Sequence, residues 1–292
     1  MSKNNLFIVS VMVVSGLVFQ SLVTAQRQGG TQQAKPRTPP PSPQAAAAGD
    51  VQSVLFNWMW YMGMLRGVDE VDRVATIDIR KGTGTLQVDG QPCKLTEYRA
   101  SINYQMPGMR VQYTCTRPNG QTTKAIEVVS GQFAWDEDQM GAGLVAGHGT
   151  ATPKPAALNE RLIRLWTGPQ GAPKAAAMAG ANTKVAVEAG KAVVTFPIPG
   201  VAGATAKATL NADNRAERLE VRQGAKVTEF IYSKYADLNT PGNKAEGFFA
   251  GSVVEKQDGM TVRDIAIGET EVGNPYVIMP VPQSVQRAST AH

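Results

Sequence analysis

Apolar and polar residues alternate with a period of two over most of the chain from residue 74 onward. This alternation is typical of half-buried β-strands. About six such runs precede the middle of the chain and about seven follow residue 182, all separated by short turns. Asp89-Gly90 and Asn119-Gly120 supply the positive-φ residues that two-residue hairpins require. Short connections of this kind favour antiparallel pairing over parallel crossovers.

Three shorter stretches have helical spacing instead. In residues 51–66 apolar side chains recur at intervals of three and four, and Asp50 is placed to cap the first turn. A second amphipathic stretch covers 157–168, and a short one covers 171–181. So few helices cannot cover both faces of a large sheet. We therefore expect an α+β fold with a strongly curved, mainly antiparallel sheet, an open half-barrel whose concave face the helices cover.

The two ends of the chain differ from this pattern. Residues 1–25 contain one cation, an apolar run and small residues before Gln26, the layout of a cleaved signal peptide, with a retained membrane anchor as the alternative. Residues 26–49 are rich in Pro, Ala and Gln and are expected to form a disordered linker. We expect one folded domain over 50–272, followed by a proline-punctuated tail over 273–292 that ends in disorder.

Most of the net charge of +5 lies outside the expected domain. Residues 1–49 hold four cations and no acid, which leaves 25 basic and 24 acidic residues from Asp50 onward. A nucleic-acid surface needs clustered Lys and Arg to neutralise phosphates. The nearly neutral domain therefore argues against a nucleic-acid partner. The signal peptide predicts a periplasmic or secreted bacterial protein that is soluble after cleavage and can contact a membrane transiently.

Candidate catalytic and metal-binding residues are sparse. The two histidines, His148 and His292, are too few for a His-based triad or a His-rich metal site. The carboxylates at 136–138 are more typical of a solvated turn than of a calcium site. The glycines of 141–147 match a dinucleotide fingerprint, but Pro153 prevents the helix that this motif needs. We therefore expect a protein without enzymatic activity, metal or cofactor.

Cys93 and Cys115 are the only two cysteines. An even pair in an exported chain favours one disulfide. If the surrounding strands pair about the turn at 106–108, Cys93 lies several residues from the point opposite Cys115, so a bridge requires a bulge that shifts the register. Two separate buried thiols are the alternative.

The strongest remaining signal is the set of large apolar side chains on the predicted helices and strands. A packed core is the simpler interpretation, but a few helices cannot easily fill a strongly curved sheet, and such interiors are where small-molecule pockets occur. Arg161 and Arg164, on the middle helix, could meet a phosphate headgroup at the mouth of a cavity. The candidate cavity residues are Trp58, Phe133, Trp135, Leu162, Trp166, Phe230 and Tyr232.

The order of these elements resembles the periplasmic lipoprotein-carrier fold of the LolA and LolB type. The resemblance rests on the apolar first helix before VATIDIRKGTGTLQV (74–88), on IEVVSGQFAWDED (126–138), on the mid-chain helices, and on RLEVRQGAKVTEFIYSKYADLN (218–239). In that family an unclosed antiparallel barrel, covered by helices, binds acyl chains. The resemblance implies a non-enzymatic periplasmic protein that binds a lipid or another hydrophobic molecule, with another envelope protein as a second partner. An interaction module of the same fold with a filled core is the alternative.

Overall fold

The computed structural model describes residues 50–65, 75–241 and 247–289. The expected signal peptide, 1–25, and the expected linker, 26–49, lie outside these residues. Among the helices that are described, none combines the length and the apolar character needed to cross a membrane.

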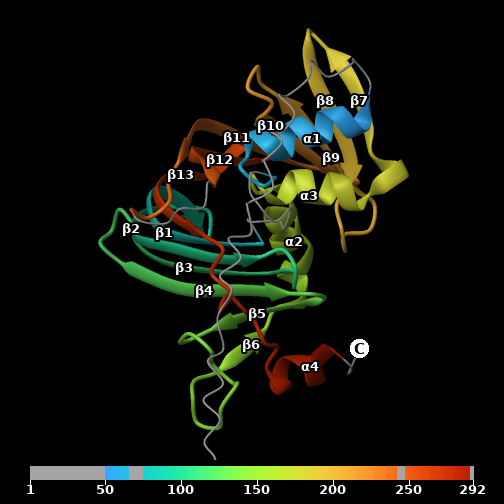
Figure 1. The fold of residues 1–292 in the computed structure, drawn as a ribbon. Helices are drawn as coiled ribbons and strands as arrows, with labels where there is room; N and C mark the ends of the chain where they lie inside the picture. The colour runs from blue at the N-terminus through green and yellow to red at the C-terminus, as the bar shows by residue number, and fades with distance from the viewer. Residues whose placement is uncertain (1–49, 66–74, 242–246, 290–292) are drawn as a thin grey trace, which may run out of the picture. The chain divides into compact units, whose positions relative to one another are not determined.

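Thirteen strands of the described chain form one antiparallel sheet (Figure 1). Its order is β6-β5-β4-β3-β2-β1-β13-β12-β11-β10-β9-β8-β7, so that the sheet consists of two meanders and remains open, with β6 and β7 at its edges. The antiparallel sheet predicted from the alternation is thus confirmed. The strands are β1 (Thr76–Val88), β2 (Gln91–Asn103), β3 (Gly108–Thr116), β4 (Thr122–Ser130), β5 (Phe133–Glu137), β6 (Ala151–Pro153), β7 (Lys184–Glu188), β8 (Lys191–Pro197), β9 (Ala204–Leu210), β10 (Ala216–Gln223), β11 (Lys226–Asp237), β12 (Phe248–Gln257) and β13 (Met260–Val272).

The two meanders are joined by the pairing of β1 with β13. This pairing runs from Ile77 opposite Val272 to Leu86 opposite Arg263. Gly84 has a φ of +137°, and a Cβ atom there would lie 2.0 Å from the backbone oxygen of Asp264. Only a residue without a side chain allows β1 to approach β13 this closely.

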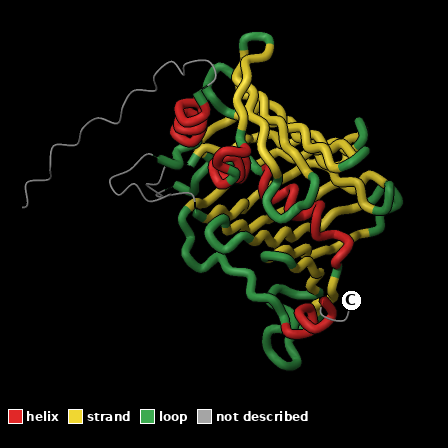
Figure 2. The backbone as a smooth tube through the Cα atoms, turned by 90° about the vertical axis from the view of Figure 1, so that its right-hand side faces the viewer, coloured by secondary structure: helices red, strands yellow, loops and turns green. Residues whose placement is uncertain are grey.

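The helices are few and short, and Figure 2 shows how far the strands outnumber them. Asp50 caps the first helix, as predicted, because its carboxylate accepts hydrogen bonds from the backbone N–H groups of Gln52 and Ser53 at 3.3 and 3.1 Å. The helical segments are α1 (Val51–Tyr61), η1 (Pro155–Ala157), α2 (Leu158–Thr167), α3 (Gly171–Met178), η2 (Gly180–Asn182) and α4 (Gln283–Ser289).

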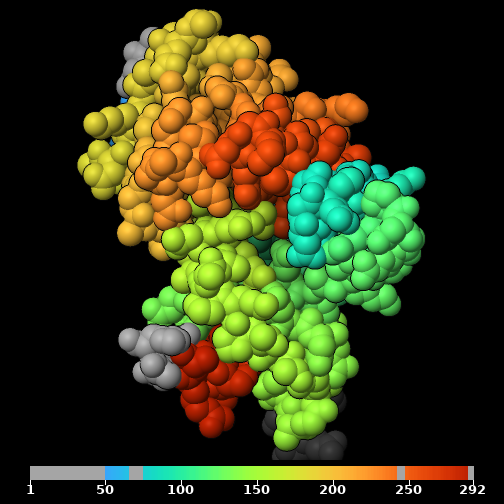
Figure 3. Space-filling model, turned by 180° about the vertical axis from the view of Figure 1, so that it is seen from behind, coloured from blue at the N-terminus to red at the C-terminus, as the bar shows by residue number. Residues whose placement is uncertain are grey.

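Helices α1, α2 and α3 pack on different parts of the sheet. Helix α2 contacts β3, β4 and β5, whereas α3 contacts β8 and α1 contacts β7 and α3. On the face seen in Figure 3, the yellow-green chain around α2 lies between the orange strands of the second meander and the green strands of the first. Helix α2 therefore packs on the first meander, and its Arg164 side chain reaches Glu255 on β12 of the second.

The C-terminal segment packs against the sheet after β13, and residues 290–292, where the tail was expected to end in disorder, lie outside the described residues. Val277, Met279 and Val285 are buried in a small hydrophobic cluster with Trp135 of β5, and the side-chain amide of Asn103 donates to the carbonyl of Val277 at 2.7 Å. Proline lacks an N–H group, so the prolines of this segment leave no donor unpaired where it lies on the sheet. The described part of the expected tail, 273–289, therefore includes side chains that pack on β5 and β6.

Cys93 of β2 and Cys115 of β3 form a disulfide, with their Cα atoms 5.4 Å apart. A register shift between Leu95 and Glu97 places Cys115 opposite Leu95, two residues from Cys93. The bulge that a bridge requires is thus present in β2. Both cysteines are fully buried in the main hydrophobic core.

Replacing both cysteines, Cys93→Ala with Cys115→Ala, should lower the free energy of unfolding by about 3 kcal/mol, because the bridge closes a loop with a sequence separation of 22. Urea denaturation of the variant and of the wild type measures this difference. Wild-type protein unfolded in the presence of a reductant serves as the control and should show a similar loss. Equal stability of oxidised wild type and variant would contradict the prediction.

Candidate functional site

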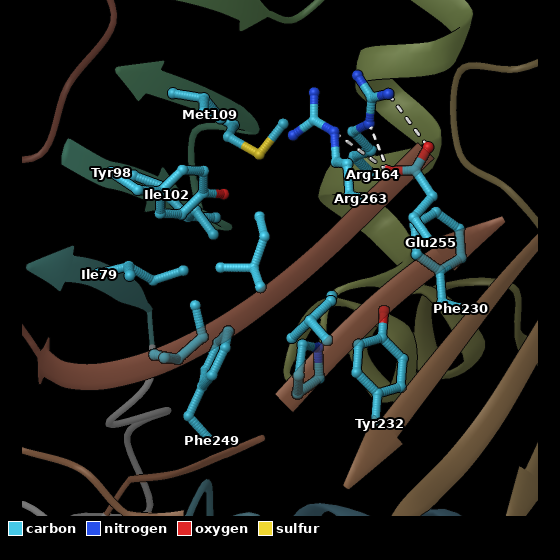
Figure 4. A pocket seen from close by; sticks show the side chains of 17 residues that line it. Ile79, Tyr98, Ile102, Met109, Arg164, Phe230, Tyr232, Phe249, Glu255 and Arg263 are labelled. Carbon is cyan, nitrogen blue, oxygen red and sulfur yellow. Dashed lines mark hydrogen bonds and ion pairs between the residues drawn. The ribbon is translucent and has the colours of Figure 1, made fainter. Parts of the chain in front are cut away.

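A cavity of about 80 Å³ lies against the central strands of the sheet (Figure 4). Strands β1, β2 and β3 contribute to its wall, as do β11, β12 and β13, and Gly168 and Pro169 between α2 and α3 also line it. The two groups of strands are far apart in the sequence and meet because β1 pairs with β13. The apolar lining residues are Ile79, Tyr98, Ala100, Ile102, Met109, Val111, Phe230, Tyr232, Phe249, Val253, Ile265 and Ile267.

Strand alternation directs these side chains to the same face of the sheet. Ala100 and Ile102 are two residues apart on β2 and lie opposite Val111 and Met109 of β3. In the second meander, Tyr232 of β11 lies opposite Val253 of β12 in the same way. Because every second residue of a strand points to one face, these side chains together form an almost continuous apolar wall.

Charged side chains gather at one end of the cavity (Figure 4). Arg164 of α2 donates from Nε and Nη2 to the carboxylate of Glu255 on β12, at 2.9 and 3.1 Å. The guanidinium of Arg263 on β13 lies 3.4 Å from the same carboxylate and 3.4 Å from that of Glu127 on β4. Glu160, one turn before Arg164, forms a further ion pair with it. The cluster therefore connects α2 to both meanders.

Burial and ion pairing act in opposite directions on these groups. Burial raises the pKa of Glu255, but the positive charges of Arg164 and Arg263 outweigh it, so that the pKa lies below its ordinary value. The pKa of Glu127 is lowered for the same reason, with burial opposing and Arg263 and Arg164 prevailing. For Arg164, burial lowers the pKa, and the negative charge of Glu255 more than reverses this effect. Both carboxylates and Arg164 are therefore charged at neutral pH.

The structure brings only two of the seven predicted cavity residues to the cavity. Phe230 and Tyr232 line it, and the Tyr232 hydroxyl donates to the carbonyl of Thr167 at the end of α2, at 2.6 Å. The others belong to packed regions: Trp58, Leu162 and Trp166 to the main core, and Phe133 and Trp135 to the small cluster beneath the C-terminal segment.

The two predicted mouth cations have different surroundings from those expected. Arg161 is only 6% exposed and donates to the carbonyls of Val128 and Trp135 at 3.0 and 2.7 Å, and to the carboxylate of Asp136 at 2.5 Å. It ties α2 to β4 and β5 and does not line the cavity. Arg164 lines the cavity, but its guanidinium is paired with Glu255.

Sequence reasoning missed Glu127, Glu255 and Arg263. A signal for Arg263 was available, because it precedes Ile265 and Ile267 at a spacing of two and so falls on an apolar strand face. Glu255 follows Val253, and Glu127 precedes Val129, at the same spacing of two. What the sequence could not show is that the three charged residues meet, because the order of their strands in the sheet is not local in sequence.

A scan against protein-family models finds no match for this chain, and a search of curated proteins finds none either. Within the described ranges, no three His, Cys, Asp or Glu side chains are grouped so that they could hold a metal ion. The cavity and its charged end are therefore the features from which a function can be argued.

Replacing Glu255 with Gln should lower the free energy of unfolding by about 3 kcal/mol at neutral pH, because two buried guanidinium groups lose their shared carboxylate. The pKa of Glu255 lies below its ordinary value of 4.5 in the folded protein. Its carboxylate therefore contributes stability above that ordinary value, and this contribution is lost as the pH falls through the lower folded value. The difference between wild type and variant should shrink in acid.

Urea denaturation over a series of pH values tests this. Glu188→Gln on the edge strand β7 is the control, because the Glu188 side chain is 52% exposed, and it should change stability by at most ~0.5 kcal/mol. A Glu255→Gln effect of the same size at every pH would contradict the assignment.

Proposed function

We propose that this protein is a non-enzymatic carrier that binds a lipid, or another molecule with an apolar chain, between the sheet and the connection of α2 with α3. In this proposal the sheet is a strongly curved, open half-barrel, and the helices cover its concave face. The cavity against the central strands is the binding site.

The observation that carries this proposal is the cavity of about 80 Å³ with its almost wholly apolar wall. Protein interiors are close-packed and leave few voids larger than a water molecule, whose share of liquid volume is about 30 Å³. Along most of this wall a water molecule would find no hydrogen-bond partner, so apolar material suits the space better than solvent. This favours a binding site over a filled core.

An acyl chain requires the cavity to expand, because pockets for drug-sized ligands measure roughly 300–1,000 Å³. The connection at Gly168 and Pro169 is the part of the wall that would move in this proposal, because it lies outside the strand ladder of the sheet. It is held by the hydrogen bond from Tyr232 to Thr167 and by the side-chain amide of Gln170, which donates to the carbonyl of Phe248. Burial of an apolar chain, at about 25 cal/mol per Å², would offset the loss of these bonds.

The resemblance to the LolA and LolB type of carrier supports the same proposal. In carriers of that type an acyl chain binds the apolar face of an open antiparallel sheet. Their periplasmic location also agrees with the export expected from residues 1–25. A lipid or lipophilic small molecule in the bacterial periplasm is then the ligand, and transient contact with a membrane or with another envelope protein would deliver it.

An envelope interaction module is the second candidate function, and one observation favours it. The loop between β5 and β6 exposes Met140, Leu144 and Val145, at 61%, 41% and 68%. The same loop is compact, since His148 Nε2 lies 3.0 Å from the carbonyl of Met140 and the carboxylate of Asp138 accepts from the backbone N–H of Thr150 at 2.8 Å. A fixed loop with exposed apolar side chains could contact a partner protein without any ligand in the cavity.

Filling the cavity distinguishes the two functions. Val253→Trp places a large side chain where a half-buried valine lines the wall, and it should weaken binding of methyl parinarate, a neutral fluorescent chain, at least about tenfold. Fluorescence titration of the full chain measures this. Val187→Trp, at an exposed position of β7, is the matched control and should bind like the wild type. Equal binding by both variants, or no binding by the wild type, would leave the interaction module as the function.

A further inference from the structure

The charged end of the cavity is electrically balanced. Two guanidinium groups, Arg164 and Arg263, face two carboxylates, Glu127 and Glu255. Their side chains are 13%, 12%, 21% and 2% exposed, respectively, so water screens them poorly. The buried groups at this end therefore sum to no net charge.

The neighbouring charged and titratable groups do not change this balance in favour of an anion. Arg161 is paired with Asp136, and Glu160 adds a negative charge at the more exposed rim. Burial raises the pKa of Tyr98, and it raises that of Tyr113 to about 12, so both hydroxyls stay neutral at ordinary pH. Among the described residues at this end, positive charges do not outnumber negative ones, so a phosphate or carboxylate would find no uncompensated cation.

Charge balance restricts what the end group of a bound chain can be. A carboxylate placed beside these four groups would add an uncompensated negative charge to a buried site. This costs far more than the burial of an uncharged polar group that forms hydrogen bonds. An ester or a hydroxyl leaves the balance unchanged.

Arg263 is the group best placed to hydrogen-bond such an end group. Both of its contacts, to Glu255 and to Glu127, measure 3.4 Å, whereas charge-assisted hydrogen bonds are typically about 2.7–2.9 Å. Arg263 is one of the residues that line the cavity. An ester carbonyl or a hydroxyl oxygen can therefore accept from Arg263 without separating Arg164 from Glu255.

The far side of Glu255 offers further hydrogen-bonding groups. Glu255 also lines a second hollow of about 190 Å³, where Glu160 and Lys226 carry opposite charges. Asn159, Gln223 and Thr228 add uncharged polar side chains to that lining, and Ala156 and Ile163 add apolar ones. Amide and hydroxyl groups of this kind suit a polar, uncharged headgroup such as glycerol.

We propose that the polar end of the cavity selects acyl chains with an uncharged end group, such as acylglycerols, over fatty-acid anions, an inference that rests on the carrier function proposed above. Arg263 donates to the ester or hydroxyl oxygen, and the pair of Arg164 with Glu255 stays intact. The balance of the four buried charges is what rejects the anion.

Competition between two ligands with the same chain tests this. Monopalmitoylglycerol and palmitate are each used to displace methyl parinarate from the full chain, at a mildly alkaline pH where palmitate is ionised and at concentrations below micelle formation. The concentration of monopalmitoylglycerol that displaces half of the probe should be at least about tenfold lower than that of palmitate. Equal or stronger displacement by palmitate would overturn the inference while leaving the carrier function standing. A wild-type protein that binds no probe would overturn both.

A change in the charge balance should change the selectivity. Glu127→Gln removes one negative charge at the more exposed of the two buried carboxylates. It should strengthen displacement by palmitate about tenfold, with little effect on monopalmitoylglycerol. Glu188→Gln on β7 makes the same change in the total charge of the protein and should leave both ligands unaffected. An unchanged preference in a folded Glu127→Gln variant would contradict the charge-balance account. If that variant does not fold, the comparison on the wild type still decides the question.

Discussion

The pairing of β1 with β13 is the contact on which the rest of the structure depends. Without it the chain would form two separate meanders, each with an exposed edge. The close approach at Gly84 makes the pairing possible, and the pairing brings β1–β3 beside β11–β13. The cavity lies on these six strands, so it is a consequence of a long-range pairing and not of any local motif.

The pairing of β1 with β13 also brings together the charged residues of the two meanders, so that each buried charge at the end of the cavity has an opposite charge beside it. Arg263 sits on β13, Glu255 on β12 and Glu127 on β4, so the ion pairs cross from one meander to the other, and Arg164 adds helix α2 to them. A buried ion pair contributes little net stability compared with apolar packing, but it penalises arrangements in which its partners are apart. The cluster thus specifies how the two meanders and α2 fit together, and it also gives the cavity a polar end.

Local patterns in the sequence were sufficient for most strands, for the Asp89-Gly90 turn and for the capped first helix, because period-two alternation and positive-φ turns are local properties. The second expected two-residue turn is longer, since β3 ends at Thr116 and β4 begins at Thr122, and β6 lies in a stretch without alternation. No local signal in the sequence predicts the pairing of β1 with β13. None predicts which aromatic side chains face the cavity and which face another part of the core. Trp166 and Tyr232 were therefore assigned to one interior, although only Tyr232 reaches the cavity. Arg161 was assigned to the cavity mouth for the same reason, since spacing on a helix shows neighbours on that helix but not the carbonyl groups of β4 and β5 that it meets.

The central claim is that the apolar cavity holds an acyl chain, and its most direct test is mass spectrometry of an organic extract. The full chain would be purified from a bacterial host without detergent and extracted. The account predicts a neutral acyl lipid in an amount close to one molecule per protein. A protein that yields no lipid, and gains none when incubated with monopalmitoylglycerol, would contradict it.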